Sequence, residues 1–123
     1  MADPRQGLAR RGEAAAALRL RQEGYRILER NHRSPRGEID LIAQDGDTLV
    51  FVEVKTRRAT RGGSPKEAVT PRKQRRLSLL ALEYLKAHSR LDRPARFDVV
   101  AVSWNEEAPE IEIVRNAFEL RLR

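Results

Sequence analysis

The chain has 123 residues, contains no cysteine and carries a formal net charge of +7. This length indicates one domain that can bury a core without disulfides. No apolar run approaches the roughly 20 residues of a membrane span, and the N-terminus lacks a secretory apolar segment. We therefore expect a single domain over residues 1–123, with no membrane partner and in the reducing cytoplasm.

The N-terminal part predicts a helix followed by a strand. Residues 6–23 are rich in alanine, arginine and other good helix formers, and Gly24 is a typical helix stop. Residues 25–30 then predict a strand, and residues 32–37 predict a polar, turn-rich connection. This segment leads into the part of the chain that carries the chemistry.

A β-hairpin follows. Its arms, residues 39–43 and 48–54, are rich in β-branched and apolar side chains and flank the turn signal Asp45-Gly46. Folding at that turn predicts the following cross-strand pairs: Ala43 with Thr48, Leu41 with Val50, Ile39 with Val52, and Glu38 with Glu53. The run Val50-Phe51-Val52 indicates a strand that is buried on both faces.

The hairpin gathers charged side chains on one face. Because side chains alternate along a strand, one face is predicted to hold the following residues: Glu38, Asp40, Leu49, Phe51, Glu53 and Lys55. Like charges directly opposite each other destabilise a hairpin unless something neutralises them, and a divalent cation would do so. The alternative is a solvated face with surface ion pairs, each worth roughly 0–1 kcal/mol.

The composition restricts the choice of metal. With no cysteine and only two histidines, His32 and His88, the chain cannot build a zinc site of the usual nitrogen and sulfur ligands. Carboxylate oxygens from Asp40 and Glu53 suit Mg²⁺ or Mn²⁺. We therefore expect one of these two ions as the cofactor.

The second half of the chain predicts two helical starts and two strands. Residues 57–63 predict a basic loop, and residues 64–67 fit a capping box. Thr70-Pro71 opens a longer helix that runs to about His88. Its predicted buried stripe consists of Leu77, Leu80, Ala81, Tyr84 and Leu85. Strands are predicted at residues 96–104 and 110–114.

The positive charge is concentrated directly after the hairpin. Residues 57–76 account for the entire net charge, with Glu67 as their single acid. The basic residues are Arg57, Arg58, Arg61, Lys66, Arg72, Lys73, Arg75 and Arg76. Basic side chains beside a metal-ready acidic face favour binding to a phosphate backbone. A solvated basic helix and an anionic membrane surface are the alternatives, but no segment offers the large aromatic residues of an interfacial anchor.

Two runs of residues resemble a known family. They are Gly37-Glu38-Ile39-Asp40-Leu41-Ile42-Ala43 and Val50-Phe51-Val52-Glu53-Val54-Lys55-Thr56-Arg57. The chain resembles the YraN-like family of small bacterial proteins. This family belongs to the restriction-endonuclease-like PD-(D/E)xK superfamily and is similar to archaeal Holliday junction resolvases. Further matching positions are Gly12-Glu13, Gly24-Tyr25-Arg26-Ile27-Leu28, Arg30-Asn31, Lys73, Arg96-Phe97-Asp98-Val99-Val100 and Asn116-Ala117-Phe118. The chain departs from the superfamily's pattern at Ile39, where proline is usual.

The resemblance implies an α/β fold with an αβββαβ core and a mixed central sheet flanked by helices. It implies that Asp40 and Glu53 ligate the metal and that Lys55 positions or deprotonates the attacking water, so that these three form the catalytic set. Glu13 matches an acidic residue on the first helix of resolvase-like members and is expected as a further metal ligand. The alternative is an ordinary surface glutamate. Asp98 is expected to have a supporting or structural role.

These expectations lead to one preferred function. The chain is predicted to be a metal-dependent endonuclease that acts on DNA rather than RNA, including branched or structured DNA. Five residues are predicted to bind nucleic acid: Arg57, Arg58, Arg61, Lys73 and Arg76. The resemblance also allows a homodimer. Two alternatives stay open, a non-catalytic nucleic-acid-binding module of the same fold and a basic structural protein.

Overall fold

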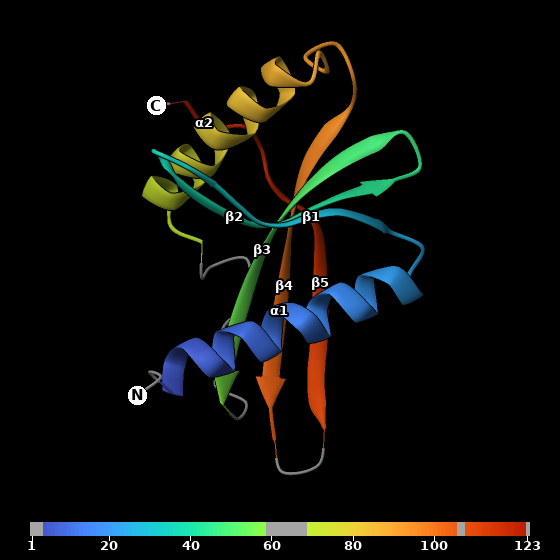
Figure 1. Cartoon of the computed structure of the whole chain (residues 1–123), viewed down its shortest axis with the longest axis vertical. Helices are drawn as coiled ribbons and strands as arrows, with labels where there is room; N and C mark the ends of the chain where they lie inside the picture. Colours follow the sequence, from blue (N-terminus) through green and yellow to red (C-terminus); the bar gives the residue numbers. More distant parts are fainter. Residues whose placement is uncertain (1–3, 59–68, 106–107, 123) are drawn as a thin grey trace.

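The computed structural model describes residues 4–58, 69–105 and 108–122. Their elements follow the order helix, three strands, helix, two strands (Figure 1). The bounds are α1 (Pro4–Gln22), β1 (Arg26–Ser34), β2 (Gly37–Asp45), β3 (Thr48–Arg58), α2 (Pro71–Ala87), β4 (Ala95–Trp104) and β5 (Pro109–Phe118).

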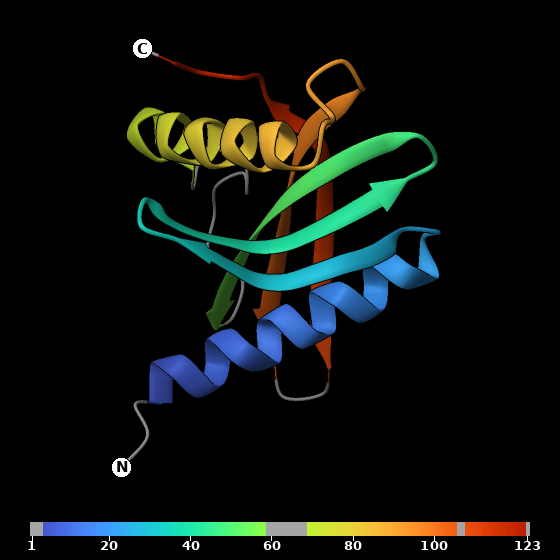
Figure 2. The same cartoon turned by 45° about the horizontal axis from the view of Figure 1, so that its top comes forward.

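The strands form a mixed sheet in the order β1-β2-β3-β4-β5. β3 and β4 are parallel, and the other neighbouring strands are antiparallel. The crossover that a parallel pair requires contains α2. The two helices cover opposite faces of the sheet (Figure 2). The predicted αβββαβ core is thus confirmed, and β5 extends it by one antiparallel strand.

Each helix packs on its own half of the core. Between the sheet and α2 lies a cluster that contains Phe51, Leu80 and Tyr84. Between the sheet and α1 lies a second cluster, to which Ala16, Ala17 and Leu20 contribute from the helix. The predicted stripe of α2 is buried in full, and Val50-Phe51-Val52 is buried on both faces of the sheet.

The predicted register of the hairpin is wrong by two residues. β2 and β3 pair as Leu41 with Val52, Ala43 with Val50 and Asp45 with Thr48. The loop therefore consists of Gly46 and Asp47, one position later than expected. Gly46 has a φ of 60°, which glycine adopts without strain at the first loop position of a tight hairpin.

Several element bounds also differ from the expectation. β1 continues to Ser34, so His32 lies in a strand rather than in a loop, and its ring packs edge-on against Tyr84. β3 continues through Arg57 and Arg58 because these residues pair with Ser103 and Trp104 of β4. The predicted capping box at residues 64–67 lies outside the described residues. Neither α1 nor α2 is both long and apolar enough to cross a membrane.

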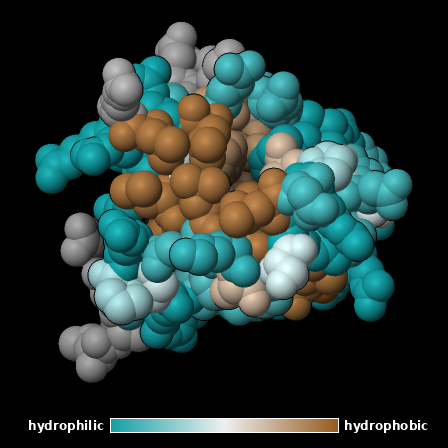
Figure 3. All heavy atoms as spheres, turned by 90° about the horizontal axis from the view of Figure 1, so that it is seen from above, coloured by the Kyte–Doolittle hydropathy of each residue, from teal (hydrophilic) through white to brown (hydrophobic). Residues whose placement is uncertain are grey.

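Apolar side chains gather at the end of the molecule where α2 ends and β4 begins (Figure 3). A cavity of about 420 Å³ lies here, and its lining includes Leu85, Leu91, Phe97, Phe118 and Leu120. Leu91 and Leu120 are among the exposed large apolar residues of the described chain. The charged residues of the candidate site are not part of this lining.

Candidate active site

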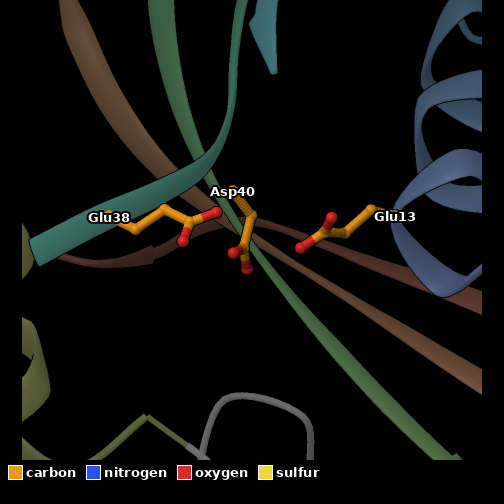
Figure 4. Close-up of side chains that lie close together, drawn as sticks. All are labelled: Glu13, Glu38 and Asp40. Carbon is orange, nitrogen blue, oxygen red and sulfur yellow. The ribbon is translucent and has the colours of Figure 1, made fainter. Parts of the chain in front are cut away.

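Three carboxylates meet where β2 passes α1. Glu13 projects from α1, while Glu38 and Asp40 project from β2, and all three are partly buried (Figure 4). One carboxylate oxygen from each residue lies within 4.8 Å of the other two. Two of the predicted metal ligands, Glu13 and Asp40, thus lie close together. The third member of the group is Glu38, where Glu53 was expected.

An asparagine side chain forms hydrogen bonds with two of these carboxylates. Asn31 of β1 donates its side-chain Nδ2–H groups to Glu13 Oε1 at 3.0 Å and to Glu38 Oε1 at 2.8 Å. Its backbone has a φ of 54°, a left-handed conformation that asparagine adopts more readily than most residues. Sequence reasoning missed Asn31 as a site residue, and the match of Arg30-Asn31 to the family was the only signal for it.

Asp40 lies where β2 breaks its regular alternation. Ile39 and Ile42 both pack in the α2-side cluster, whereas Leu41 and Ala43 pack in the α1-side cluster. Strict alternation would place Ile39 and Leu41 on the same face, so the strand turns over next to Asp40. The Val54 N–H of β3 donates to Asp40 Oδ2 at 2.8 Å. This bond fixes the carboxylate against β3.

The environment of Asp40 disfavours its charge. Burial, the negative charge of Glu53 and a hydrogen bond with Glu53 raise the pKa of Asp40 to about 9, and the charge of Glu13 adds to this effect. The bond from Val54 opposes the shift. Without a cation, this environment therefore favours the protonated form of Asp40.

Glu53 has a cationic partner from α2. Its side chain is only 5% exposed, and its Oε2 forms an ion pair with Nζ of Lys73. Sequence reasoning predicted Lys73 as a nucleic-acid contact and Glu53 as a metal ligand. In the structure Lys73 neutralises Glu53 directly, which places Lys73 inside the candidate site.

Lys55 belongs to the same group of charges. Burial and the neighbouring Lys73 ammonium lower the pKa of Lys55, while the charges of Glu53 and Asp40 oppose this shift. A lysine that loses its proton more easily can accept one from water. Asp40, Glu53 and Lys55 thus influence one another electrostatically.

A glycine brings α1 close enough for Glu13 to reach the site. A Cβ on Gly12 would collide with the side chain of Thr56 on β3. Gly12 is accordingly buried, although it lies in the middle of a helix, where glycine is unfavourable. The close approach of α1 and β3 places Glu13 opposite Asp40.

The donor set fits a hard divalent cation. Three carboxylates supply oxygen ligands of the kind that Mg²⁺ and Mn²⁺ prefer, and their mutual repulsion favours a bound positive charge. Glu13, Glu38 and Asp40 would hold the ion. When bound, it would polarise a phosphodiester oxygen and increase the acidity of water.

Two of the predicted nucleic-acid-binding residues, Lys73 and Arg76, line one cavity, and Arg57 lines another. Arg57 donates from Nε to Ser103 Oγ at 3.1 Å and lines a small cavity with Glu110 and Glu112. Arg58 is exposed at the end of β3, and Arg61 lies outside the described residues. Arg76 packs its side chain over Gly37, close to the start of β2.

Asp98 has a structural role. It is fully buried and accepts hydrogen bonds from the Tyr25 hydroxyl at 2.6 Å, from Arg96 Nε at 3.0 Å and from the Asn116 N–H at 3.0 Å. These bonds join the start of β1 to β4 and β5. Asp98 is not among the causes of the pKa shifts of Asp40 and Lys55.

The fold and the sequence together place this chain in a family of small bacterial proteins. The model of the uncharacterised protein family UPF0102, the YraN family, matches residues 12–102, and the chain belongs to this family. It is 56% identical over 110 residues to a UPF0102 protein of Syntrophus aciditrophicus, covering 89% of this chain and 86% of the relative. It is 48% identical over 122 residues to one of Desulfosudis oleivorans, covering 99% and 98%.

Among solved structures, SfsA of Pyrococcus furiosus in complex with Ca²⁺ aligns with a TM-score of 0.37 and 15% identity. The alignment covers 82% of this chain and 58% of the SfsA chain. This similarity is too low to support a shared activity.

Proposed function

We propose that this protein is a Mg²⁺- or Mn²⁺-dependent endonuclease that hydrolyses phosphodiester bonds in DNA, including branched or otherwise structured DNA. The observation that supports this most directly is the convergence of Glu13, Glu38 and Asp40 beside the buried Glu53 and the partly buried Lys55. We expect the protein to act in the cytoplasm, since a chain without cysteine suits a reducing compartment. The predicted homodimer stays a prediction.

Each site residue would have a separate role in metal binding, proton transfer or charge stabilisation. Glu13, Glu38 and Asp40 would hold the divalent cation, and Glu53 would join them if its ion pair with Lys73 opened. Lys55 positions the attacking water and takes its proton, which its lowered pKa favours. The water oxygen bonds to phosphorus, the bond between phosphorus and the leaving strand's oxygen breaks, and that oxygen takes a proton from solvent. The lysines at the site stabilise the negative charge that develops on the phosphate.

The test of catalysis is a cleavage assay on defined substrates. Supercoiled, single-stranded and four-way-junction DNA are incubated with the protein and with Mg²⁺ or Mn²⁺. We expect cleavage that disappears with EDTA and falls by at least about a hundredfold in Lys55→Ala. Lys86→Ala, an exposed lysine in the last turn of α2, is the matched control and should cleave like the wild type. A matched RNA substrate tests the preference for DNA.

One observation supports a second candidate, a nucleic-acid-binding module of the same fold without catalysis. The ion pair of Lys73 with Glu53 occupies a carboxylate that the resemblance assigns to the metal. This candidate predicts that DNA binds to the wild type and to Lys55→Ala with equal affinity. It also predicts that neither protein cleaves any of the substrates with either metal.

A further inference from the structure

A cationic cavity lies beside the site. It has a volume of about 510 Å³ and is formed by the first turns of α2 together with the turn that connects β1 and β2. The lining residues are Arg36, Thr70, Arg72, Lys73, Arg75, Arg76 and Leu79. This volume is in the range of roughly 300–1,000 Å³ that small ligands occupy, so the cavity can hold more than a single small ion.

The positive charge of this cavity is only partly compensated. Arg36 pairs with Glu83 at 3.1 Å, and Lys73 pairs with Glu53. Arg75 donates from Nε to the neutral Leu122 carbonyl at 3.3 Å. Across residues 4–58, 69–105 and 108–122, no ion pair involves Arg72 or Arg76. An anion bound here would therefore meet guanidinium groups that no described carboxylate neutralises.

The position of these cations on α2 is unfavourable unless an anion is present. The first turn of a helix has unbonded N–H groups and a partial positive charge, which favours acids and disfavours bases. The first turn of α2 contains no acid, and Arg72 and Lys73 lie within it. A phosphate oxygen would complement both the side chains and the helix end.

The cavity adjoins the candidate site through two residues. Lys73 lines the cavity and also pairs with Glu53. Arg76 lines the cavity and lies over Gly37, which directly precedes Glu38 in β2. A strand whose phosphate occupies the cavity would therefore pass next to the carboxylates.

The lining also indicates which part of a nucleotide is recognised. Among the described residues that form the cavity, none is aromatic, and Leu79 is the single large apolar residue. A base would lack a stacking partner there, whereas a phosphate would meet guanidinium groups from α2 and from the turn between β1 and β2. The contact should consequently depend on charge and not on base identity.

We propose that this cavity binds an uncleaved phosphate group of the nucleic-acid strand and thereby positions the strand at the carboxylates. The inference rests on the proposed function, because it supplies the strand that the site would cut. The phosphate can be an internal phosphodiester or a terminal phosphomonoester, since both offer anionic oxygens. Arg72 and Arg75 are the test positions because neither contacts the candidate metal ligands.

The experiment measures the affinity for fluorescently labelled single-stranded and duplex DNA at several salt concentrations, in EDTA. We expect Arg72→Gln with Arg75→Gln to weaken binding roughly tenfold near 0.1 M salt and to reduce the slope of log affinity against log salt by about 1.5 to 2. The matched control, Arg21→Gln with Arg26→Gln, removes the same charge from exposed positions at the end of α1 and the start of β1. It should change affinity and slope much less, and thermal melting checks that both variants fold.

Substrate variants separate the two sources of phosphate. If a 5′- or 3′-phosphate strengthens binding to the wild type but not to the cavity variant, the cavity holds a terminal phosphate. If the wild type binds DNA equally well with and without a terminal phosphate, the cavity holds an internal phosphodiester. Homopolymers of thymine and of adenine should bind alike, and a base preference that disappears in the cavity variant would overturn the proposal.

The inference and the proposed function fail in different ways. If the wild type binds DNA and the cavity variant binds it with the same affinity and salt slope, the cavity proposal is wrong and the proposed nuclease stands. If the wild type binds no nucleic acid but binds vesicles with anionic lipids, both are wrong.

Discussion

The ammonium group of Lys73 on α2 forms an ion pair with the nearly buried carboxylate of Glu53 on β3. These residues lie twenty positions apart in the chain. Glu53 was predicted as a metal ligand, and Lys73 was predicted as a nucleic-acid contact. The pair neutralises Glu53 where a metal-binding site would otherwise use it. We therefore expect Lys73 to limit how many carboxylates are available to a cation.

Replacing Lys73 by methionine should have opposite effects without and with metal. In EDTA, Lys73→Met leaves the buried Glu53 without its partner and should lower the free energy of unfolding by about 1–3 kcal/mol. In Mn²⁺ the freed carboxylate can join the ligands, so the metal should raise the melting temperature more than it does in the wild type. Thermal melting in EDTA and in MnCl₂ measures both effects.

Lys86→Met is the matched control for this experiment, because Lys86 is exposed in the last turn of the same helix. It should change neither the metal-free stability nor the gain with Mn²⁺. Unchanged stability of Lys73→Met in EDTA would show that the ion pair contributes nothing, and the role assigned to Lys73 would be wrong.

Asp40→Asn should stabilise the metal-free protein at alkaline pH. The pKa of Asp40 is raised from 3.8 to about 9, so between these values the folded chain binds a proton that the unfolded chain does not. Stability therefore falls as pH rises through this window, by up to about 1.4 kcal/mol for each pH unit. Asparagine has no charge to lose, and the variant should lack this decline.

Chemical unfolding in EDTA from pH 4 to pH 9 measures the effect, and Asp47→Asn in the exposed hairpin turn is the control. The unfolding free energies of Asp40→Asn and of Asp47→Asn, each relative to its own value at pH 4, should separate as the pH rises. Mn²⁺ should stabilise the wild type and the control but not Asp40→Asn. A decline with pH that is equally steep in both variants would exclude Asp40 as its cause.

The faces of β3 could be predicted although the register of the hairpin could not. The predicted pairs are shifted by two residues, and an even shift keeps each β3 side chain on its face. Phe51, Glu53 and Lys55 were therefore assigned to a common face correctly. The turn was misplaced because Asp45-Gly46 and Gly46-Asp47 are both plausible hairpin loops, and only glycine's positive φ at the first loop position decides between them.

The contacts between elements could not be predicted from local patterns. Alternation along β2 gives no sign that the strand turns over next to Asp40, and this turn brings Glu38 to Glu13. The position of Glu13 depends on how closely α1 packs on β3, which is a tertiary property. The family resemblance indicated Glu13, but it could not reveal that Asn31 joins Glu13 to Glu38.

Asn31→Gly should weaken metal binding without destabilising the backbone. Glycine tolerates the φ of 54° but removes the amide that orients Glu13 and Glu38. Loss of such a supporting hydrogen-bond donor typically lowers metal affinity by roughly ten- to a hundredfold. Isothermal titration with Mn²⁺ measures the affinity, and melting in EDTA measures the stability.

Asn31→Ala separates the two roles of this residue. Alanine also lacks the amide, but it is strained in the left-handed conformation, by about 1 kcal/mol. Both variants should bind Mn²⁺ equally weakly, while only Asn31→Ala loses stability in EDTA. Wild-type affinity in Asn31→Gly would mean that Glu13 and Glu38 need no help from Asn31.

Gly12→Ala should displace α1 from β3. The added Cβ would collide with Thr56, and such overpacking typically costs about 1–3 kcal/mol. Because Glu13 follows directly, its carboxylate should also move away from Asp40, so that the affinity for Mn²⁺ falls together with the stability. Gly7→Ala is the control on the same helix, where a Cβ would meet nothing within 4 Å apart from its chain neighbours and the backbone of its own helix. It should be neutral or stabilise the protein by up to about 1 kcal/mol.

Thr56→Ala tests the cause of the Gly12 effect. It removes the hydroxyl and methyl groups that the new Cβ would meet, so Gly12→Ala should cost less in the Thr56→Ala background than in the wild type. The recovered stability should be accompanied by recovered Mn²⁺ affinity, because both depend on the same approach of α1 to β3. If stability recovers and affinity does not, Glu13 is positioned by something other than this contact, and the bond from Asn31 is the remaining candidate.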